Sequence, residues 1–477
     1  MANLLSQFGV AGNALGVLQE ALSVLQNNVS NASTPGYAAQ QLNIQAQPSD
    51  SFSGGGIVSQ GLISSRDAYA DTAVQQTLQS LGFYTAQAQG TSSIQSLFDP
   101  SGTSGVAGAL TSLYGAFSAW SASPGDPATG QAVITQAKAF AGSVQGLSRS
   151  LNSVGSQLNQ QISSTVSQIN TLASRIQQYN EIKRANPTPN PGADANLEAT
   201  LESLSQLTNL TAVSQLDGTV TVLVGGGAPL VIGSEQYRIS ASIGVSTHPP
   251  ATNPQSPPTA QILSSDGKDI TAELIGGQLG GLLDSRDRVL ASIIGDSQQA
   301  GTLNQFAQGV ATKVNTILQA GTVSNAVGAA PGSALFTYSS VDATQAAGSL
   351  AVSATILPGQ LAPADAVGSS NGNALTLVSL ASPGSAPTQI NGQSFLSFFA
   401  GIASSAGQEN SSANANQTLQ QQIATQAQAQ RDQISKVSLN DQAALLLQFQ
   451  RGYQAISELL SVVNSLVNSI LSIIPQQ

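Results

Sequence analysis

Cysteine is absent from this 477-residue chain, and histidine occurs once. Without cysteine the chain can form neither a disulfide nor a thiolate metal site. The one histidine, His248, is followed by two prolines, and no HExxH pattern occurs, so neither a histidine metal site nor a Ser-His-Asp hydrolase is favoured. We therefore expect no catalytic residue, no metal site and no cofactor, and we interpret the chain as a non-enzyme.

Charged side chains are also scarce. They make up 8% of the chain, against roughly 25% in an average soluble domain. The formal net charge of -10 disfavours nucleic acid as a partner, because phosphate groups require Lys and Arg. Uncharged polar residues and alanine take the place of the missing charges, and such surfaces suit close contact between neighbouring copies of one chain.

Targeting and membrane signals are weak in this sequence. The first ten residues contain no Lys or Arg, so the positive segment that opens a secretory signal is missing. Residues 455–474 are the most apolar tract, but Ser, Asn and Glu interrupt it, and a membrane span needs about 20 predominantly apolar residues. We expect a surface helix there and no membrane insertion.

Both ends of the chain carry apolar residues at alternating steps of three and four, which is the spacing of a heptad repeat. Such a stripe along a helix must be covered by a partner. We predict that the two terminal helices pack against each other and against the same ends of other copies; an internal bundle of a monomer is the alternative that periodicity leaves open. The residues of this predicted assembly seam are Leu15, Leu18, Leu22, Leu25, Val29, Leu446, Phe449, Tyr453, Ile456, Leu460, Val463, Val467, Ile470 and Ile474.

Between these ends we expect a helical frame. Pro35 and Gly36 end the first helix, since the residue before a proline avoids the helical region and glycine permits a turn. Asp126 and Pro127 are typical of an N-cap and a first helical residue, and the helix that they open would be a rod of roughly 85 Å if unbroken. The predicted helices cover residues 4–29, 66–98, 106–120, 127–184, 277–320 and 393 onward.

Alternating residues predict strands in the middle of the chain. Asp217 and Gly218 are typical of a turn that joins two strands, and Gly225 to Gly227 of a second turn. The predicted strands cover residues 42–46, 57–64, 212–216, 220–224, 230–232, 237–245, 350–356 and 374–379. The fold class is therefore α+β, with long terminal helices in a coiled-coil-like bundle and β-rich domains inserted in the middle. We predict four domains. Residues 1–45 with 437–477 form a terminal coiled-coil domain, and residues 46–185 with 276–320 and 390–436 form a helical rod domain. Residues 186–275 are the first β-rich insert, and residues 321–389 are the second, smaller insert.

Three motifs carry a resemblance to a known family. Residues 26–37 are QNNVSNASTPGY and residues 438–446 are SLNDQAALL; they resemble the terminal motifs of flagellar rod, hook and hook-associated proteins. Residues 276–287, GGQLGGLLDSRD, resemble the hook-associated members of that family, although residues 201–204 (LESL) depart from the more charged element usual there. The family-motif residues are Asn28, Asn31, Thr34, Pro35, Gly36, Tyr37, Gly280, Leu283, Asp284, Arg286 and Asp287.

The resemblance implies a structural subunit that self-assembles at the junction of flagellar hook and filament. The implied partners are other copies of the chain, the hook protein, a second junction protein (hook-associated protein 3) and an export chaperone that masks the C-terminal helix. Export by the flagellar type III system would place the protein outside the cell. The alternatives are a hook or distal-rod protein, which should lack the helix over residues 127–184 and the element 276–287, and a secreted adhesin or binding module, which should show a signal peptide.

The charges at Asp284, Arg286, Asp287 and Arg288 stand out in a charge-poor chain. We interpret them as a solvated helix face with ion pairs worth about 0–1 kcal/mol each. A contact with a neighbouring subunit is the alternative.

Overall fold

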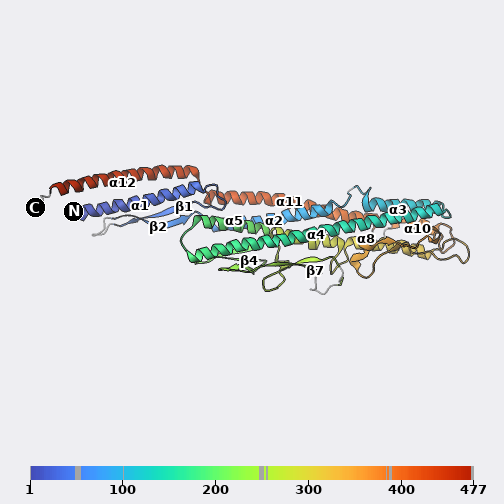
Figure 1. Cartoon of the computed structure of the whole chain (residues 1–477). Helices are drawn as coiled ribbons and strands as arrows, with labels where there is room; N and C mark the ends of the chain where they lie inside the picture. Colours follow the sequence, from blue (N-terminus) through green and yellow to red (C-terminus); the bar gives the residue numbers. More distant parts are fainter. Residues whose placement is uncertain are drawn as a thin grey trace.

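The two chain ends lie side by side at one end of an elongated molecule (Figure 1). The computed structural model describes residues 2–48, 55–99, 101–245, 252–253, 256–382, 384–385 and 389–473. His248 and Ile474 lie outside the described residues. The predicted α+β class with long terminal helices is confirmed.

The part of the molecule that holds both ends is called the terminal module here. Its first helix lies against both the last helix and a two-stranded antiparallel ribbon, β1 with β2. Residues Ser6–Ser30 of that first helix are long and apolar enough to cross a membrane by length and composition alone; in this structure they lie against the ribbon and the last helix. The module consists of α1 (Ala2–Ser30), β1 (Gln40–Gln47), β2 (Gly56–Ser64) and α12 (Leu439–Ile473).

A long helical body, called the rod here, continues from the terminal module (Figure 1). Its longest helix, α4, runs unbroken for 59 residues, about 88 Å at 1.5 Å per residue. Asp126 caps it by accepting a hydrogen bond from the N–H of Ala128, and Pro127 is its first residue, as predicted. Helix α4 covers Pro127–Ala185. The other long helices of the rod are α2 (Ala68–Gln95), α3 (Gly105–Ala122), α5 (Pro191–Leu207), α8 (Thr302–Ala320) and α11 (Phe395–Ser435).

The first insert forms two small antiparallel sheets on the side of α4. The predicted hairpin is confirmed, with residues 210–214 paired to residues 220–224. Its first strand lies two residues earlier than the predicted 212–216, and Leu216 is exposed in the turn. The glycine turn is also confirmed: Gly225, Gly226 and Gly227 all have positive φ between two paired strands. The strands are β3 (Leu210–Ser214), β4 (Val220–Val224), β5 (Ala228–Ile232) and β6 (Glu235–Gln236) in one sheet, and β7 (Ser240–Gly244) with β8 (Thr259–Leu263) in the other.

The single helix predicted over residues 277–320 is wrong. Gly295 and Gly301 have φ of 83° and 81° and turn the chain between two helical segments. Asp296 stabilises the turn, since its carboxylate accepts hydrogen bonds from the N–H groups of Gln298 and Gln299. The first segment consists of α6 (Gly277–Leu283), a π-helical stretch η2 (Asp284–Leu290) and α7 (Ala291–Ile294), and the second is α8.

The second insert contains less strand than predicted. Residues 374–379 were predicted as a strand and belong to helix α10 (Gly372–Ser379), because Ala374 and Leu377, three residues apart, are both buried where this helix meets α3 and α8. Of residues 350–356, only β10 (Ala351–Val352) is a strand, paired with β9 (Phe336–Thr337). The remaining short elements are α9 (Ala346–Ser349) and the 3-10 turns η1 (Thr271–Glu273), η3 (Ala343–Gln345) and η4 (Pro358–Gln360).

Candidate functional site: the terminal module and its joint with the rod

The predicted C-terminal stripe faces the first helix of the same chain. Val463 is 5% exposed, and the other described stripe residues up to Val467 are half-buried. The two helices approach closely, because a Cβ placed on Gly452 would lie 3.4 Å from Leu18. Gln19 also donates a hydrogen bond to the Tyr453 hydroxyl across the pair. The predicted pairing of the chain ends is therefore confirmed, whereas their packing against other copies stays a prediction. The stripe residues of α12 are Leu446, Phe449, Tyr453, Ile456, Leu460, Val463 and Val467, with Ile470 further along the helix.

The N-terminal stripe is only partly as predicted. Leu18 and Leu25 are buried and Leu15 and Leu22 half-buried, but Val29 is 49% exposed. A second apolar face, which heptad counting missed, is also buried: Ala11, Val17, Ala21 and Val24. The helix has two buried faces because it is covered by both α12 and the β1–β2 ribbon.

Asn28, not Val29, occupies the buried end of this helix, and its side chain is fully buried. Its amide donates hydrogen bonds to the carbonyl of Gln40 and to Oε1 of Gln442, at 2.8 and 2.9 Å. Its Oδ1 accepts from the hydroxyl of Tyr37 and from the N–H of Gln40. Both donors and both acceptor positions of the amide are used. The motif asparagine therefore ties α1, the following turn, β1 and α12 into one unit.

The motif turn after α1 docks on the rod. Gly36 has φ +73°, and a Cβ there would overlap the backbone carbonyl of Ala195 in α5, so only glycine permits this contact. Tyr37, Ala195 and Val437 form a small buried apolar cluster beside it. Asn31 and Thr34 stabilise the turn itself, since Thr34 Oγ1 lies 3.3 Å from Asn31 Oδ1 and Asn31 donates to the carbonyl of Asn27; Pro35 lines the adjacent pocket.

Short hydrogen bonds cross the joint between the terminal module and the rod. The N–H of Ala39 donates to the carbonyl of Ser435 at 2.8 Å, and the N–H of Ser65 donates to the carbonyl of Ala39. The Ser65 hydroxyl also donates to the Ser435 carbonyl. Two segments near the start of the chain, at Ala39 and Ser65, therefore meet Ser435, which lies hundreds of residues later in the sequence.

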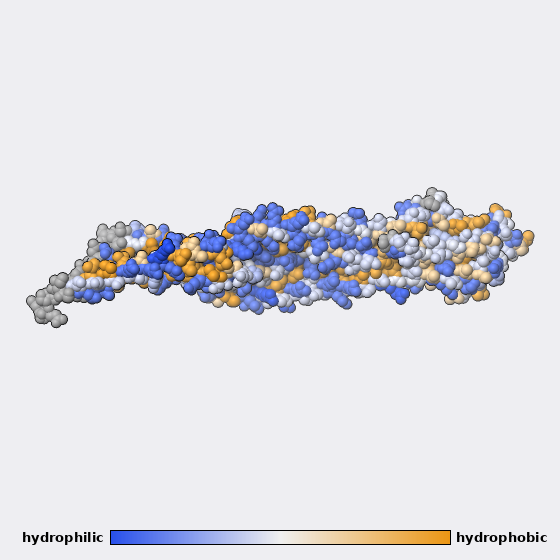
Figure 2. Space-filling view, turned by 90° about the horizontal axis from the view of Figure 1, so that it is seen from above, coloured by the Kyte–Doolittle hydropathy of each residue, from blue (hydrophilic) through white to orange (hydrophobic). Residues whose placement is uncertain are grey.

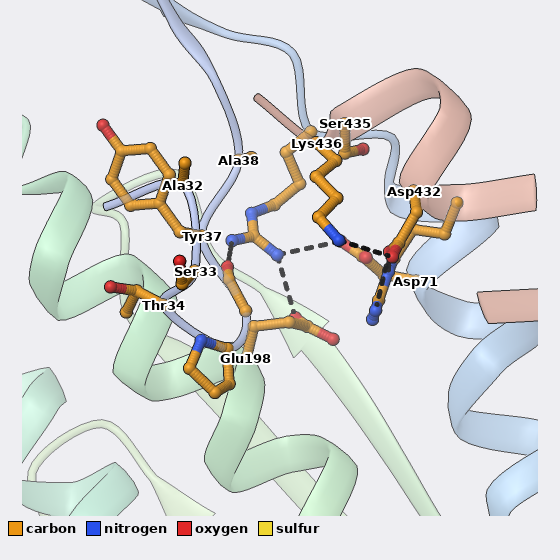
Figure 3. A pocket seen from close by; sticks show the side chains of 14 residues that line it. Ala32, Ser33, Thr34, Tyr37, Ala38, Asp71, Glu198, Asp432, Ser435 and Lys436 are labelled. Carbon is orange, nitrogen blue, oxygen red and sulfur yellow. Dashed lines mark hydrogen bonds and ion pairs between the residues drawn. The ribbon is translucent and has the colours of Figure 1, made fainter. Parts of the chain in front are cut away.

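Charged side chains gather around a cavity of about 150 Å³ at this joint (Figure 3). Arg66 lies between Asp71 and Glu198, at 3.1 and 3.4 Å, and donates a 2.5 Å hydrogen bond to the carbonyl of Gly36. A second group lies beside it: Arg431 pairs with Glu202 and Asp432, and Lys436 with Asp432. This concentration is unusual in a chain with 8% charged residues.

Burial dominates the electrostatics of Glu198. Desolvation, reinforced by the nearby carboxylate of Asp71, raises the pKa of Glu198 to about 7, although Gln75 and Arg66 oppose the shift. One oxygen of Asp71, Oδ1, is buried without a hydrogen-bond partner. The pocket therefore holds two carboxylates that share one arginine, and burial favours a proton on Glu198 near neutral pH.

The motif over residues 276–287 lies in the rod and serves close packing. A Cβ on Gly281 would overlap the carbonyl of Phe83, and one on Gly280 would lie 2.8 Å from the carbonyl of Leu274. Leu283 is buried, and Asp284 accepts a hydrogen bond from Gln87 of α2. These glycines let α6 lie directly on α2.

The prediction that the four charged residues at 284–288 form a solvated helix face is wrong for Arg286 and Asp287. Arg286 is 1% exposed and donates to the carbonyl of Pro258, and burial raises the pKa of Asp287 to about 7. Arg288 does form exposed ion pairs, with Asp284 at 2.7 Å and Glu409 at 2.8 Å. The π-helical stretch here shifts the register of the side chains, and sequence spacing does not reveal it.

A further apolar stripe on α12, which heptad counting missed, is uncovered. Its members are about half exposed and lie on a different side of the helix from the seam that faces α1. Apolar side chains gather over the terminal module in the view of Figure 2. The stripe consists of Leu459, Val462 and Leu466. Leu447, about three turns earlier in the same helix, is also about half exposed.

Within the described part of the chain, no group of three or more His, Asp or Glu side chains gathers in a way that could hold a metal ion. The side chains of the site pack the terminal module together and connect it to the rod.

Comparison with known proteins points to one family. A family model described as the flagellar hook-associated protein FlgK helical domain matches residues 91–336, more than half of the chain. The chain is 23% identical to flagellar hook-associated protein 1 of Bacillus subtilis over 97% of both chains. It is 26% identical to the Escherichia coli protein of the same description over 65% of this chain and 56% of that one. A solved structure of the flagellar hook junction protein FlgK from Burkholderia pseudomallei aligns with TM-score 0.47 and 25% identity over 57% of this chain and 47% of that one.

Proposed function

This chain belongs to the family of the flagellar hook-associated protein FlgK, and from that premise we propose that it is a structural, non-enzymatic subunit of the hook–filament junction. It connects the hook to the filament by packing with copies of itself. The observation that carries this proposal is the terminal module, which both chain ends build together and which leaves an apolar stripe of α12 uncovered.

The terminal module is suited to a homopolymer. Glu20, Asp441, Arg451 and Glu458 are the only charged residues within residues 1–45 and 437–477. Little charge repulsion therefore opposes the approach of identical modules, and the exposed leucines and valine of α12 supply area to bury. The hook or distal-rod alternative is not favoured, since the matched region includes both α4 and the element 276–287.

The finer partners follow from the same surface. We infer that the hook protein and hook-associated protein 3 are the neighbours on the two sides of the junction. An uncovered apolar helix face favours aggregation in the cell, so an export chaperone would cover α12 until the flagellar type III system has exported the chain. The working location is then extracellular, on the flagellum.

The structure changes which residues should be tested for assembly. Leu460 and Val463 lie in the seam that faces α1, so replacing them with Asp is expected to disrupt the module itself. Leu459 and Val462 are 53% and 57% exposed, so charges at these positions leave the module intact. Burying such side chains between subunits would contribute about 1.5–3 kcal/mol each.

The experiment expresses two double variants in a strain that lacks the gene. Leu459→Asp with Val462→Asp is expected to keep the thermal unfolding of the rod but to leave hooks without attached filaments. Ser461→Asp with Asn464→Asp adds the same charge at exposed polar positions of the same helix and is expected to restore filaments. Normal filaments with the first variant would overturn the assembly surface proposed here.

A further inference from the structure

Two Asn-Gly pairs occur in the chain, at residues 371–372 and 391–392. In such a pair the backbone nitrogen of glycine can attack the side-chain amide of the asparagine before it, because glycine has no side chain that hinders the approach. The two pairs share this chemistry, but the fold places them in different surroundings. The structure therefore separates the effect of folding from the effect of sequence.

Asn391 and Gly392 form the tip of a tight turn in front of α11. The backbones of Ile390 and Gln393 exchange two hydrogen bonds, of 2.8 and 3.2 Å, on either side of the pair. Both tip residues have positive φ, 47° for Asn391 and 72° for Gly392. Positive φ at both central residues defines a type I′ turn, the two-residue hairpin turn that Asn-Gly favours.

The reacting groups of this pair are unrestrained. Asn391 and Gly392 are both exposed, and a Cβ added to Gly392 would meet nothing within 4 Å. Among the described residues, neither the side-chain amide of Asn391 nor the N–H of Gly392 has a hydrogen-bond partner. The nitrogen of the glycine and the amide carbon of the asparagine are therefore both accessible to each other and to water.

The pair Asn371–Gly372 is held at both reacting groups. The Asn371 amide donates a 2.9 Å hydrogen bond to the carbonyl of Ser121 at the end of α3. The N–H of Gly372 donates to the carbonyl of Ser369 at 3.3 Å. A Cβ on Gly372 would overlap the carboxylate of Asp365, so this glycine is also closely packed. Both hydrogen bonds must break before the glycine nitrogen can reach the amide carbon.

We propose that Asn391 is a site of spontaneous covalent modification in the folded protein and that the fold protects Asn371 from the same reaction. The nitrogen of Gly392 attacks Cγ of Asn391, so that a new N–Cγ bond forms and the Cγ–Nδ2 bond breaks. The amide group leaves as ammonia, which takes up the proton of the Gly392 nitrogen, and a cyclic imide remains. Water then opens the imide at either carbonyl and gives aspartate or isoaspartate. Water is the only co-reactant, and the proposal is independent of the junction function.

Isoaspartate at this position alters the start of α11. Its backbone runs through the former side chain and is one methylene longer, so the turn cannot keep both hydrogen bonds between Ile390 and Gln393. The turn is attached to the rod, since Ile390 and Phe395 both lie 3.3 Å from the Cβ position of Gly309 in α8. The new carboxylate also falls within residues 314–408, which hold only two charged side chains, both acidic. The modified chain therefore separates from the parent chain in anion exchange.

The test follows both pairs by mass spectrometry while the full-length chain is incubated at pH 8. No Lys or Arg lies between Lys313 and Arg431, so trypsin leaves both pairs on one peptide, whereas chymotrypsin separates them by cleaving after Leu380. The mass change from amide to acid reports deamidation, and labelling by an isoaspartate-specific methyltransferase reports isoaspartate. Because two hydrogen bonds restrain the pair at Asn371, its reaction is expected to be about 5- to 150-fold slower than that of Asn391.

Two controls make every outcome decisive. In denaturant both pairs are expected to react at similar rates, which shows that folding causes the difference. Asn391→Gly keeps a residue that tolerates positive φ in the turn but removes the amide, so the product at this site must disappear while Asn371 is unaffected. No product at Asn391 in the folded chain, equal rates for the two pairs there, or the same ratio of rates in denaturant would overturn the proposal.

Discussion

Removing the Asn28 side chain should loosen the terminal module without affecting the rod. Asn28 is fully buried and makes four hydrogen bonds, two of them to the buried groups Tyr37 Oη and Gln442 Oε1. Asn28→Ala would leave these two groups unpaired at about 1–3 kcal/mol each, and would remove two further bonds, to Gln40, worth about 0.5–1.5 kcal/mol each. The module should therefore lose roughly 3–9 kcal/mol of stability against local opening.

Hydrogen exchange measured by mass spectrometry reports this loss directly. Local opening that becomes easier by roughly 3–9 kcal/mol raises amide exchange by about 10²–10⁷-fold. We expect the faster exchange in the last two turns of α1 and in the first turns of α12, with unchanged exchange in α4. Asn31→Ala is the matched control, because the Asn31 side-chain amide makes only local hydrogen bonds, to the carbonyl of Asn27 and from the hydroxyl of Thr34, and none to β1 or α12. Equal protection of α1 in Asn28→Ala and in the parent chain would refute the argument that this amide holds the module together.

Further predictions concern the free energy of unfolding of the rod and its dependence on the protonation of Glu198. Gly281→Ala is expected to lower the free energy of unfolding of the rod by about 1–3 kcal/mol or more in thermal denaturation, since the added Cβ meets the backbone of Phe83; Gly142→Ala, at a helical position with nothing within 4 Å, should be neutral or stabilising by up to about 1 kcal/mol. For Glu198, the folded pKa of about 7 lies above its ordinary value of 4.5, so the native state binds the extra proton and the stability that this proton supplies is present below pH 4.5. That contribution should be lost as the pH rises to 7, by roughly 3 kcal/mol in total. Glu198→Gln should flatten this part of the stability–pH curve, and an identical slope in both chains would count against the burial argument.

Sequence spacing predicted those parts of the fold that depend on local repeats. The α12 stripe, the cap at Asp126 and the 210–224 hairpin all follow from short-range patterns and are present as expected. The glycines inside α4 do not break it, because helices α2 and α3 and the sheets pack along it and packing outweighs their low propensity.

The errors arise where contacts between distant segments decide the outcome. Asn28 is three residues after Leu25 and continues the stripe of α1, but a polar residue at that position is invisible to a count of apolar side chains. Arg286 is buried although three charged residues surround it in sequence, because residues around Pro258 cover it. The joint cluster unites Arg66, Glu198 and Arg431, which lie in separate helices and linkers, so no motif predicts it.

The most direct test of the proposed function is the position of the protein on the flagellum. A peptide epitope inserted after Gly328, an exposed loop position where an added side chain would meet nothing within 4 Å, should leave assembly intact. In cells whose only copy of the gene carries this epitope and restores motility, immunogold electron microscopy is expected to place the label in a narrow band at the boundary between hook and filament. Label along the whole filament, along the whole hook, or on no part of the flagellum would contradict the junction function.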